Sequence, residues 1–175
     1  MLTKAGASPN GISVASVFFG LSAAICLWAT ARSEGIERSI LFLAAAGIIQ
    51  LRLLCNLLDG MVAIEGGKRT SYGEVFNDMP DRFADVFILV GAGFAAAGFP
   101  FGRELGWIAA ALALMTAYIR VLGGSLGLQQ SFIGPMAKQH RMALLTGACV
   151  FSAFGQYLGL RGQIIGFALI VMTRS

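Results

Sequence analysis

The chain alternates between long apolar runs and short polar segments, and the lengths of the apolar runs predict its architecture. A membrane-spanning helix needs about 20 mostly apolar residues. Five runs are interpreted as such helices, and a sixth, close to the C-terminus, is too short to cross a bilayer unaided. The predicted spans are 12–31, 39–63, 73–99, 105–122 and 142–157, and the short run is 163–173.

The overall composition agrees with this pattern. The chain has 175 residues, of which 57% are hydrophobic and 13% charged, and its mean hydropathy is +0.75. Soluble domains carry about 25% charged residues. We therefore predict an all-α integral membrane protein, a bundle of six transmembrane helices whose last helix is short or truncated, forming a single domain over 1–175. A cleaved signal peptide does not fit the first run, which exceeds the usual apolar core of about 7–15 residues.

The basic residues indicate membrane orientation rather than nucleic-acid binding. The net charge is +4, but the lysines and arginines are dispersed and no aromatic-interleaved basic patch accompanies them. In a six-span arrangement the side with more basic residues faces the cytoplasm. This side contains the N-terminus and the polar segment 65–72, although the inverted orientation stays open. Three isolated cysteines indicate neither a disulfide framework nor a zinc site.

The most polar stretch lies around the junction of the second and third spans. Asn56 and Asp59 are three residues apart, and Asn77 and Asp81 are four apart, so each pair shares one face of its helix. Because the linking segment is short, we expect these two spans to be antiparallel neighbours that bring the four side chains together. Acidic residues are costly in a membrane and mark a functional site by default. Oxygen ligands of this kind suit Mg²⁺ or Mn²⁺.

The spacing of this stretch resembles the signature of the CDP-alcohol phosphotransferases, D-x2-D-G-x2-A-R-x8-G-x3-D-x3-D. Every interval is matched between Asn56 and Asp81. Three signature residues differ, because Asn56 and Asn77 replace the first and third aspartates and Ile64 replaces the arginine.

This resemblance implies a homodimeric enzyme of phospholipid biosynthesis in the cell (inner) membrane, with its active site facing the cytoplasm. Such an enzyme transfers a phosphatidyl or related group from a CDP-linked donor, such as CDP-diacylglycerol, to an alcohol or alcohol-phosphate acceptor and releases CMP. By the same resemblance Asp81 is the catalytic base. One or two Mg²⁺ or Mn²⁺ ions are expected on Asp59, Asp81, Asn56, Asn77 and Asp78. The nucleotide is expected against Gly60, Ala63 and Gly73, and the acceptor against Arg120, Lys138 and Arg141.

The departures from the signature leave alternatives open. An asparagine can ligate through its carbonyl oxygen but brings no charge, so one metal ion or weaker affinity is expected. Asp78 is either an additional ligand or the N-cap of the third span. The basic segment around Lys138 either binds an acceptor phosphate or is a topology-determining loop that contacts lipid headgroups. Two other functions remain, a catalytically silent homologue that binds nucleotide or lipid and a small membrane transporter.

Overall fold

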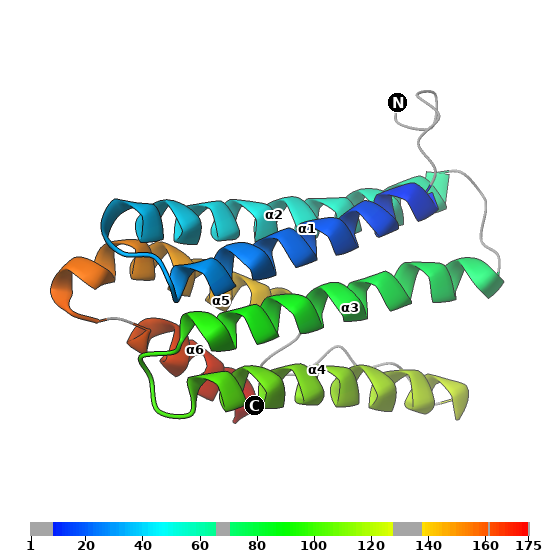
Figure 1. The fold of residues 1–175 in the computed structure, drawn as a ribbon. Coiled ribbons are helices and arrows are strands. Elements are labelled where there is room, and N and C mark those ends of the chain that lie inside the picture. The colour runs from blue at the N-terminus through cyan, green and yellow to red at the C-terminus, as the bar shows by residue number, and fades with distance from the viewer. Residues whose placement is uncertain (1–8, 66–70, 128–137, 161, 175) are drawn as a thin grey trace.

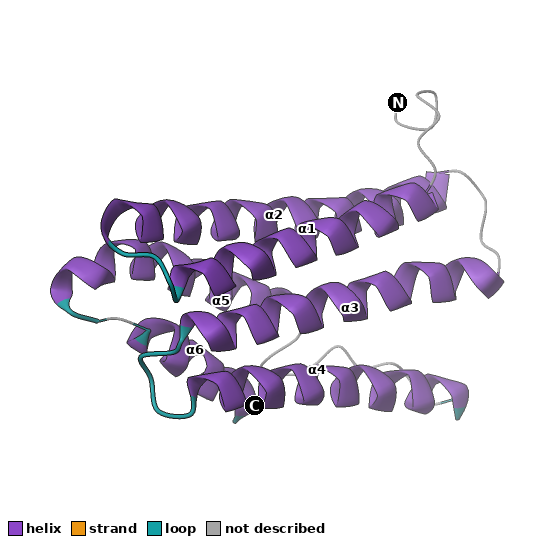
Figure 2. Ribbon diagram, in the orientation of Figure 1, coloured by secondary structure: helices purple, strands orange, loops and turns teal. Residues whose placement is uncertain are grey.

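The chain folds into a bundle of helices (Figure 1). The computed structural model describes residues 9–65, 71–127, 138–160 and 162–174, and the side chains of 9–10, 59–65, 71–77, 138 and 156 lie outside that description. The described residues contain six α-helices, one short 3-10 helix and no strand (Figure 2). The helices are α1 (Pro9–Thr30), α2 (Gly35–Glu65), α3 (Ser71–Ala95), α4 (Gly102–Ser125), α5 (Lys138–Gly155), η2 (Gln156–Leu158) and α6 (Gln163–Thr173). The predicted all-α, six-helix architecture is confirmed, and the last helix is short, with 11 residues.

The two helices that carry the signature extend further toward each other along the chain than the apolar pattern predicted. Glu65 still belongs to α2 and α3 already begins at Ser71, so the expected polar loop 65–72 is shortened at both ends. With 31 residues, α2 is about 46 Å long, whereas the hydrocarbon layer of a bilayer is about 30 Å thick. The polar end of this helix therefore has enough length to extend beyond the hydrocarbon layer.

Three helices of the described part are long and apolar enough to span a membrane. They are α1, α2 and α4, with candidate spans Gly11–Thr30, Gly35–Leu58 and Gly102–Ser125. Apolar side chains on their outer surfaces are exposed, such as Phe18 at 66% and Trp107 at 58%. Exposed apolar surface of this extent is suited to lipid rather than water, and the chain is a membrane protein.

Helix α1 lies between α2 and α3 and packs against both, whereas α2 and α3 contact each other at few positions. The expectation that the second and third spans are direct neighbours is therefore wrong along most of their length. Small residues explain the position of α1. A Cβ atom added to Gly20 would lie 2.7 Å from Ala84 Cβ, and one added to Gly91 would lie 2.7 Å from Ala24 Cα. The close contact between α1 and α3 thus requires glycine at these crossing points.

The remaining helices complete the bundle around an apolar core. Helix α4 packs on α3, α5 packs on α2, and α6 packs on both α4 and α5. The largest fully buried apolar side chains come from five of the six helices; they are Leu27, Phe42, Ile49, Ile88, Leu89, Met142, Leu145, Ile165 and Leu169.

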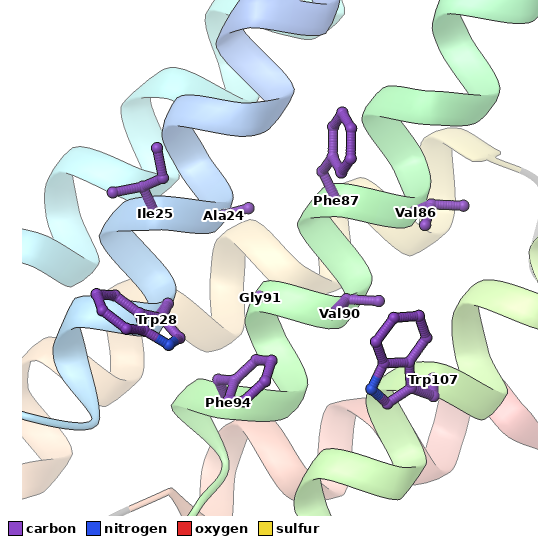
Figure 3. A pocket seen from close by; sticks show the side chains of 9 residues that line it. All are labelled: Ala24, Ile25, Trp28, Val86, Phe87, Val90, Gly91, Phe94 and Trp107. Atoms are coloured by element: carbon purple, nitrogen blue, oxygen red, sulfur yellow. The ribbon is translucent and has the colours of Figure 1, made fainter.

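An open apolar pocket of about 340 Å³ lies where α1, α3 and α4 meet (Figure 3). Trp28, Phe94 and Trp107 are among its lining residues, none of which is charged. None of the residues that line this pocket belongs to the signature.

Candidate active site

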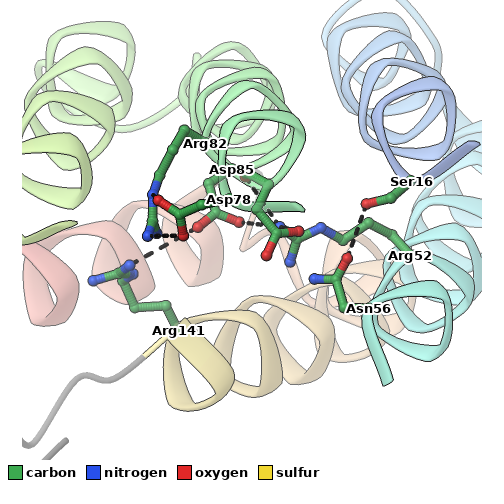
Figure 4. Close-up of polar contacts among 8 residues, drawn as sticks. Ser16, Arg52, Asn56, Asp78, Arg82, Asp85 and Arg141 are labelled. Carbon is green, nitrogen blue, oxygen red and sulfur yellow. Dashed lines mark hydrogen bonds and ion pairs between the residues drawn. The ribbon is translucent and has the colours of Figure 1, made fainter. Parts of the chain in front are cut away.

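A fully buried arginine connects the two helices that carry the signature. Arg52 of α2 is 0% exposed, and its Nη2 atom lies 3.2 Å from Asp81 Oδ1 and 2.7 Å from Asp85 Oδ1 (Figure 4). The same nitrogen donates a hydrogen bond of 3.1 Å to the Asp81 carbonyl oxygen. Asp81 and Asp85 are four residues apart and thus lie on one face of α3. One guanidinium therefore reaches both carboxylates and compensates their burial.

The network continues from α3 to α5. Asp85, which is 3% exposed, faces Arg141 across 3.9 Å from its second carboxylate oxygen. Arg141 was expected in the basic loop before the fifth span, but it lies inside α5 and is only 7% exposed. The charge of Asp85 explains this position, because a buried guanidinium needs a nearby anion.

Further arginines surround this network. Arg120 of α4 and Arg82 of α3 both lie within electrostatic range of Arg141, as Arg52 does. Arg82 pairs with Asp78 one helical turn away. The described side chains of this cluster are therefore four arginines from four helices and three aspartates, namely Arg52, Arg82, Arg120, Arg141, Asp78, Asp81 and Asp85.

Asp78 is not a helix cap. Helix α3 begins at Ser71, seven residues earlier, so the N-cap interpretation is wrong. Its carboxylate forms an i, i+4 ion pair with Arg82, and its side chain is 50% exposed. A ligand role for Asp78 remains a prediction, and it requires the carboxylate to be shared with Arg82.

Asn56 is held by α1. The Ser16 hydroxyl donates a hydrogen bond of 3.1 Å to Asn56 Oδ1, whereas the buried Nδ2 atom has no partner within the described part of the chain. Because a serine hydroxyl can also accept a hydrogen bond, the amide can turn over and present Oδ1 to the site while it keeps its contact with Ser16. Asn56 is therefore compatible with a neutral metal ligand.

The other predicted site residues are placed by their backbone alone. Asp59, Gly60 and Ala63 lie in the last two turns of α2, and Gly73 and Asn77 lie in the first two turns of α3. Lys138 is the first residue of α5. The side chains of Asp59, Ala63, Asn77 and Lys138 lie outside the described residues, so the predicted contacts of these residues stay predictions. The described side chains include no group of three acidic, histidine or cysteine residues that could hold a metal ion.

Sequence reasoning missed the ion pairs that support Asp81. Arg52 stands within an apolar run and Asp85 lies four residues after Asp81, and both features were visible in the sequence. Because a charge in a spanning helix almost always has a partner, the pairing of these two residues could have been expected. The contact of Ser16 with Asn56 had no such signal, since serine is common in spanning helices.

Comparison with known proteins supports the fold. No protein-family model matches the chain, and no curated protein matches it either. Among solved structures, the crystal structure of the phosphatidylinositol phosphate synthase from Mycobacterium tuberculosis in its apo form superposes with a TM-score of 0.71. The match covers 98% of this chain and 88% of the synthase, at 18% sequence identity. The chain therefore has the fold of this synthase, and its resemblance to the CDP-alcohol phosphotransferases is confirmed at the level of the fold.

Proposed function

We propose that the chain is a membrane transferase of the CDP-alcohol phosphotransferase type. It would move a phosphatidyl or related group from a CDP-linked donor, such as CDP-diacylglycerol, to an alcohol acceptor. The observation that carries this proposal is the position of Asp81. This residue stands at the last signature position, is 20% exposed, and is held by Arg52 within a fold shared with a phosphatidylinositol phosphate synthase.

The reaction needs an acceptor oxygen to attack the phosphorus that bears the lipid. A new bond forms between that oxygen and the phosphorus, the bond from the phosphorus to the bridging oxygen of CMP breaks, and the bridging oxygen leaves with CMP. Asp81 would accept the proton of the acceptor hydroxyl. General bases of this type contribute about 10²–10⁴-fold to the rate. Its ion pair with Arg52 would hold the carboxylate in one orientation.

The donor set suits a hard divalent cation. Asp59 and Asp81 with the amide oxygens of Asn56 and Asn77 would hold Mg²⁺ or Mn²⁺, and Asp78 would add a ligand if it were shared with Arg82. When bound, the ion neutralises charge on the transferred phosphate and on the leaving CMP. The glycines at positions 60 and 73 and Ala63 would leave room for the nucleotide.

The acceptor would be an alcohol phosphate. Arg120 and Arg141 come from different helices and lie close enough to interact electrostatically, and two neighbouring guanidiniums are suited to bind one phosphate. Lys138, at the start of α5, would add to this binding site. We further propose a single domain over 1–175 that forms a homodimer in the inner membrane, with this site at the cytoplasmic face.

A catalytically silent homologue that binds nucleotide or lipid is the second candidate. The two asparagines at signature positions and the ion pair on Asp81 favour it, because they reduce the negative charge available to divalent cations. Metal-dependent release of CMP from CDP-diacylglycerol, measured with a panel of alcohols and alcohol phosphates, separates the two functions. The silent homologue would bind the donor and release no CMP.

A further inference from the structure

The charge balance at Asp81 differs from what the signature alone implies. A site with aspartate at all four signature positions would carry a charge of −4, whereas two asparagines reduce this site to −2. The structure reduces it again, because one of the two remaining carboxylates, Asp81, lies 3.2 Å from the Arg52 guanidinium. Asp85 shares that guanidinium at 2.7 Å and also faces Arg141, so two arginines compensate the two carboxylates. The positive charge that a metal ion would otherwise supply to Asp81 is thus already present.

Arg52 is well suited to supply a permanent positive charge to the Asp81 carboxylate. It is 0% exposed, so neither water nor salt screens it, and it lies in a core that also contains Ile49 and Ile88. Its Nε and Nη1 atoms are buried without a hydrogen-bond partner in the described part of the chain. Within the described part of the chain, Nη2 therefore makes the polar contacts of this side chain, and they are directed to Asp81 and Asp85.

We propose that Arg52 is a positioning residue that fixes the Asp81 carboxylate and replaces a second divalent cation, so that the site binds no more than one such ion. The inference rests on the proposed function, because it concerns the metal requirement of the same site. Arg52 contacts Asp81 and not the reacting groups, and it acts through that carboxylate.

The direct test is the number of Mn²⁺ ions bound by the purified full-length protein in detergent, measured by electron paramagnetic resonance. We expect no more than one ion for each chain at saturation. Two tightly bound ions for each wild-type chain would overturn the proposal, whatever the activity of the protein.

A pair of variants isolates the charge of Arg52. Removing Arg52 alone would leave Asp85 buried without its main counter-ion, which is strongly destabilising. The comparison therefore uses Asp85→Asn as the reference and the double variant Arg52→Gln with Asp85→Asn as the test. We expect the double variant to bind Mn²⁺ roughly tenfold more tightly than the reference, which corresponds to about 1.4 kcal/mol. Equal Mn²⁺ affinity in the two variants would overturn the role of Arg52.

Two further variants control for charge and for folding. Arg103→Gln removes an arginine near the other end of α4, where its guanidinium lies over Phe94, so its Mn²⁺ affinity should stay close to that of the wild type. An equal rise in Arg103→Gln would show a general effect of net charge and would contradict a specific role for Arg52. If the double variant does not fold, Arg52→Lys keeps the charge and should keep the wild-type stoichiometry; a gain of a second ion there would refute the proposal.

The metal-binding measurement and the activity measurement test the two proposals separately. A wild-type protein that binds one Mn²⁺ ion and releases no CMP with any acceptor would reject the transferase function and leave the charge role of Arg52 in place. A wild-type protein that releases CMP while it binds two ions would reject the role of Arg52 and leave the transferase function in place.

Discussion

Arg52 of α2 and Asp81 of α3 form an ion pair that joins residues 29 positions apart in the sequence. The pair links two helices that contact each other at few positions, because α1 packs against both of them. The ion pair holds the side chain of Asp81 in one position. The precision of a catalytic base depends on this kind of support.

Loss of the Asp81 carboxylate should abolish turnover. Asp81→Asn keeps the size of the side chain and removes its ability to accept a proton, so CMP release should fall by about 10²–10⁴-fold. Asp59→Asn should have a similar effect through loss of metal binding. Glu104→Gln, in the first turn of α4, is the control and should retain wild-type activity. An active Asp81→Asn protein would remove Asp81 from the mechanism.

Restoring the aspartates of the signature should strengthen metal binding. The double variant Asn56→Asp with Asn77→Asp adds two negative charges, so a lower Mg²⁺ concentration should support half-maximal activity. Mn²⁺ titration of the same protein provides a check that does not depend on turnover. An unchanged metal dependence would place both asparagines outside the metal coordination sphere.

Arg120 should contribute to the binding of an anionic acceptor. A charge-assisted hydrogen bond is worth about 1.5–3 kcal/mol, and about 1.4 kcal/mol corresponds to a tenfold change in an equilibrium constant. Arg120→Gln should therefore raise the acceptor KM by about one to two orders of magnitude while the donor KM stays constant, provided that substrate binding is at rapid equilibrium. Lys138→Gln should act in the same direction, and Arg141→Gln should also lower stability because Arg141 faces Asp85.

The control for Arg120 lies on the same helix. Arg103 is near the other end of α4, where its guanidinium stacks over Phe94 at 5.5 Å, so Arg103→Gln should leave the acceptor KM unchanged. If the basic residues only determine topology, their replacement should instead alter the accessibility of the segment before α5 from each side of the membrane, without affecting KM. A preference for neutral or cationic acceptors would also contradict the proposed role.

The contact between α1 and α3 should depend on glycine at position 91. Alanine there would place a Cβ atom 2.7 Å from Ala24 Cα, and overpacking of this kind costs about 1–3 kcal/mol. Gly47→Ala is the matched control, since its added Cβ atom would meet nothing within 4 Å; alanine should stabilise α2 by up to about 1 kcal/mol. The midpoint temperature of thermal unfolding in detergent should thus fall for Gly91→Ala and rise for Gly47→Ala. A stable Gly91→Ala protein would show that the α1–α3 interface can relax.

The sequence predicted the number and order of the helices well because lipid imposes a length and an apolarity on each of them. It predicted less well which helices pack against one another. A short link between the second and third spans suggested direct packing, but Gly20 and Gly91 allow α1 to lie between them. Arg141 illustrates the same limit. Its place in a basic segment suggested a loop, and only the buried Asp85 opposite explains why α5 includes it.

The candidate site was predicted in part. The signature spacing selected Asp81 as a candidate, and helical periodicity placed Asn56 and Asp59 on one face of the second span. Which side chains pair could not be deduced, because pairing depends on the distance between helices rather than on intervals within one helix. Two interpretations of Asp78 stayed open until the start of α3 at Ser71 removed the capping alternative.

Release of CMP from CDP-diacylglycerol by the purified wild-type protein is the most direct test of the proposed transferase. The assay combines Mg²⁺ or Mn²⁺ with a panel of alcohol phosphates and neutral alcohols, and a parallel reaction contains a chelator. We predict CMP release that requires both the metal and an anionic acceptor and that disappears in Asp81→Asn. A folded wild-type protein that releases no CMP with any acceptor, or one whose CMP release survives Asp81→Asn, would contradict the account.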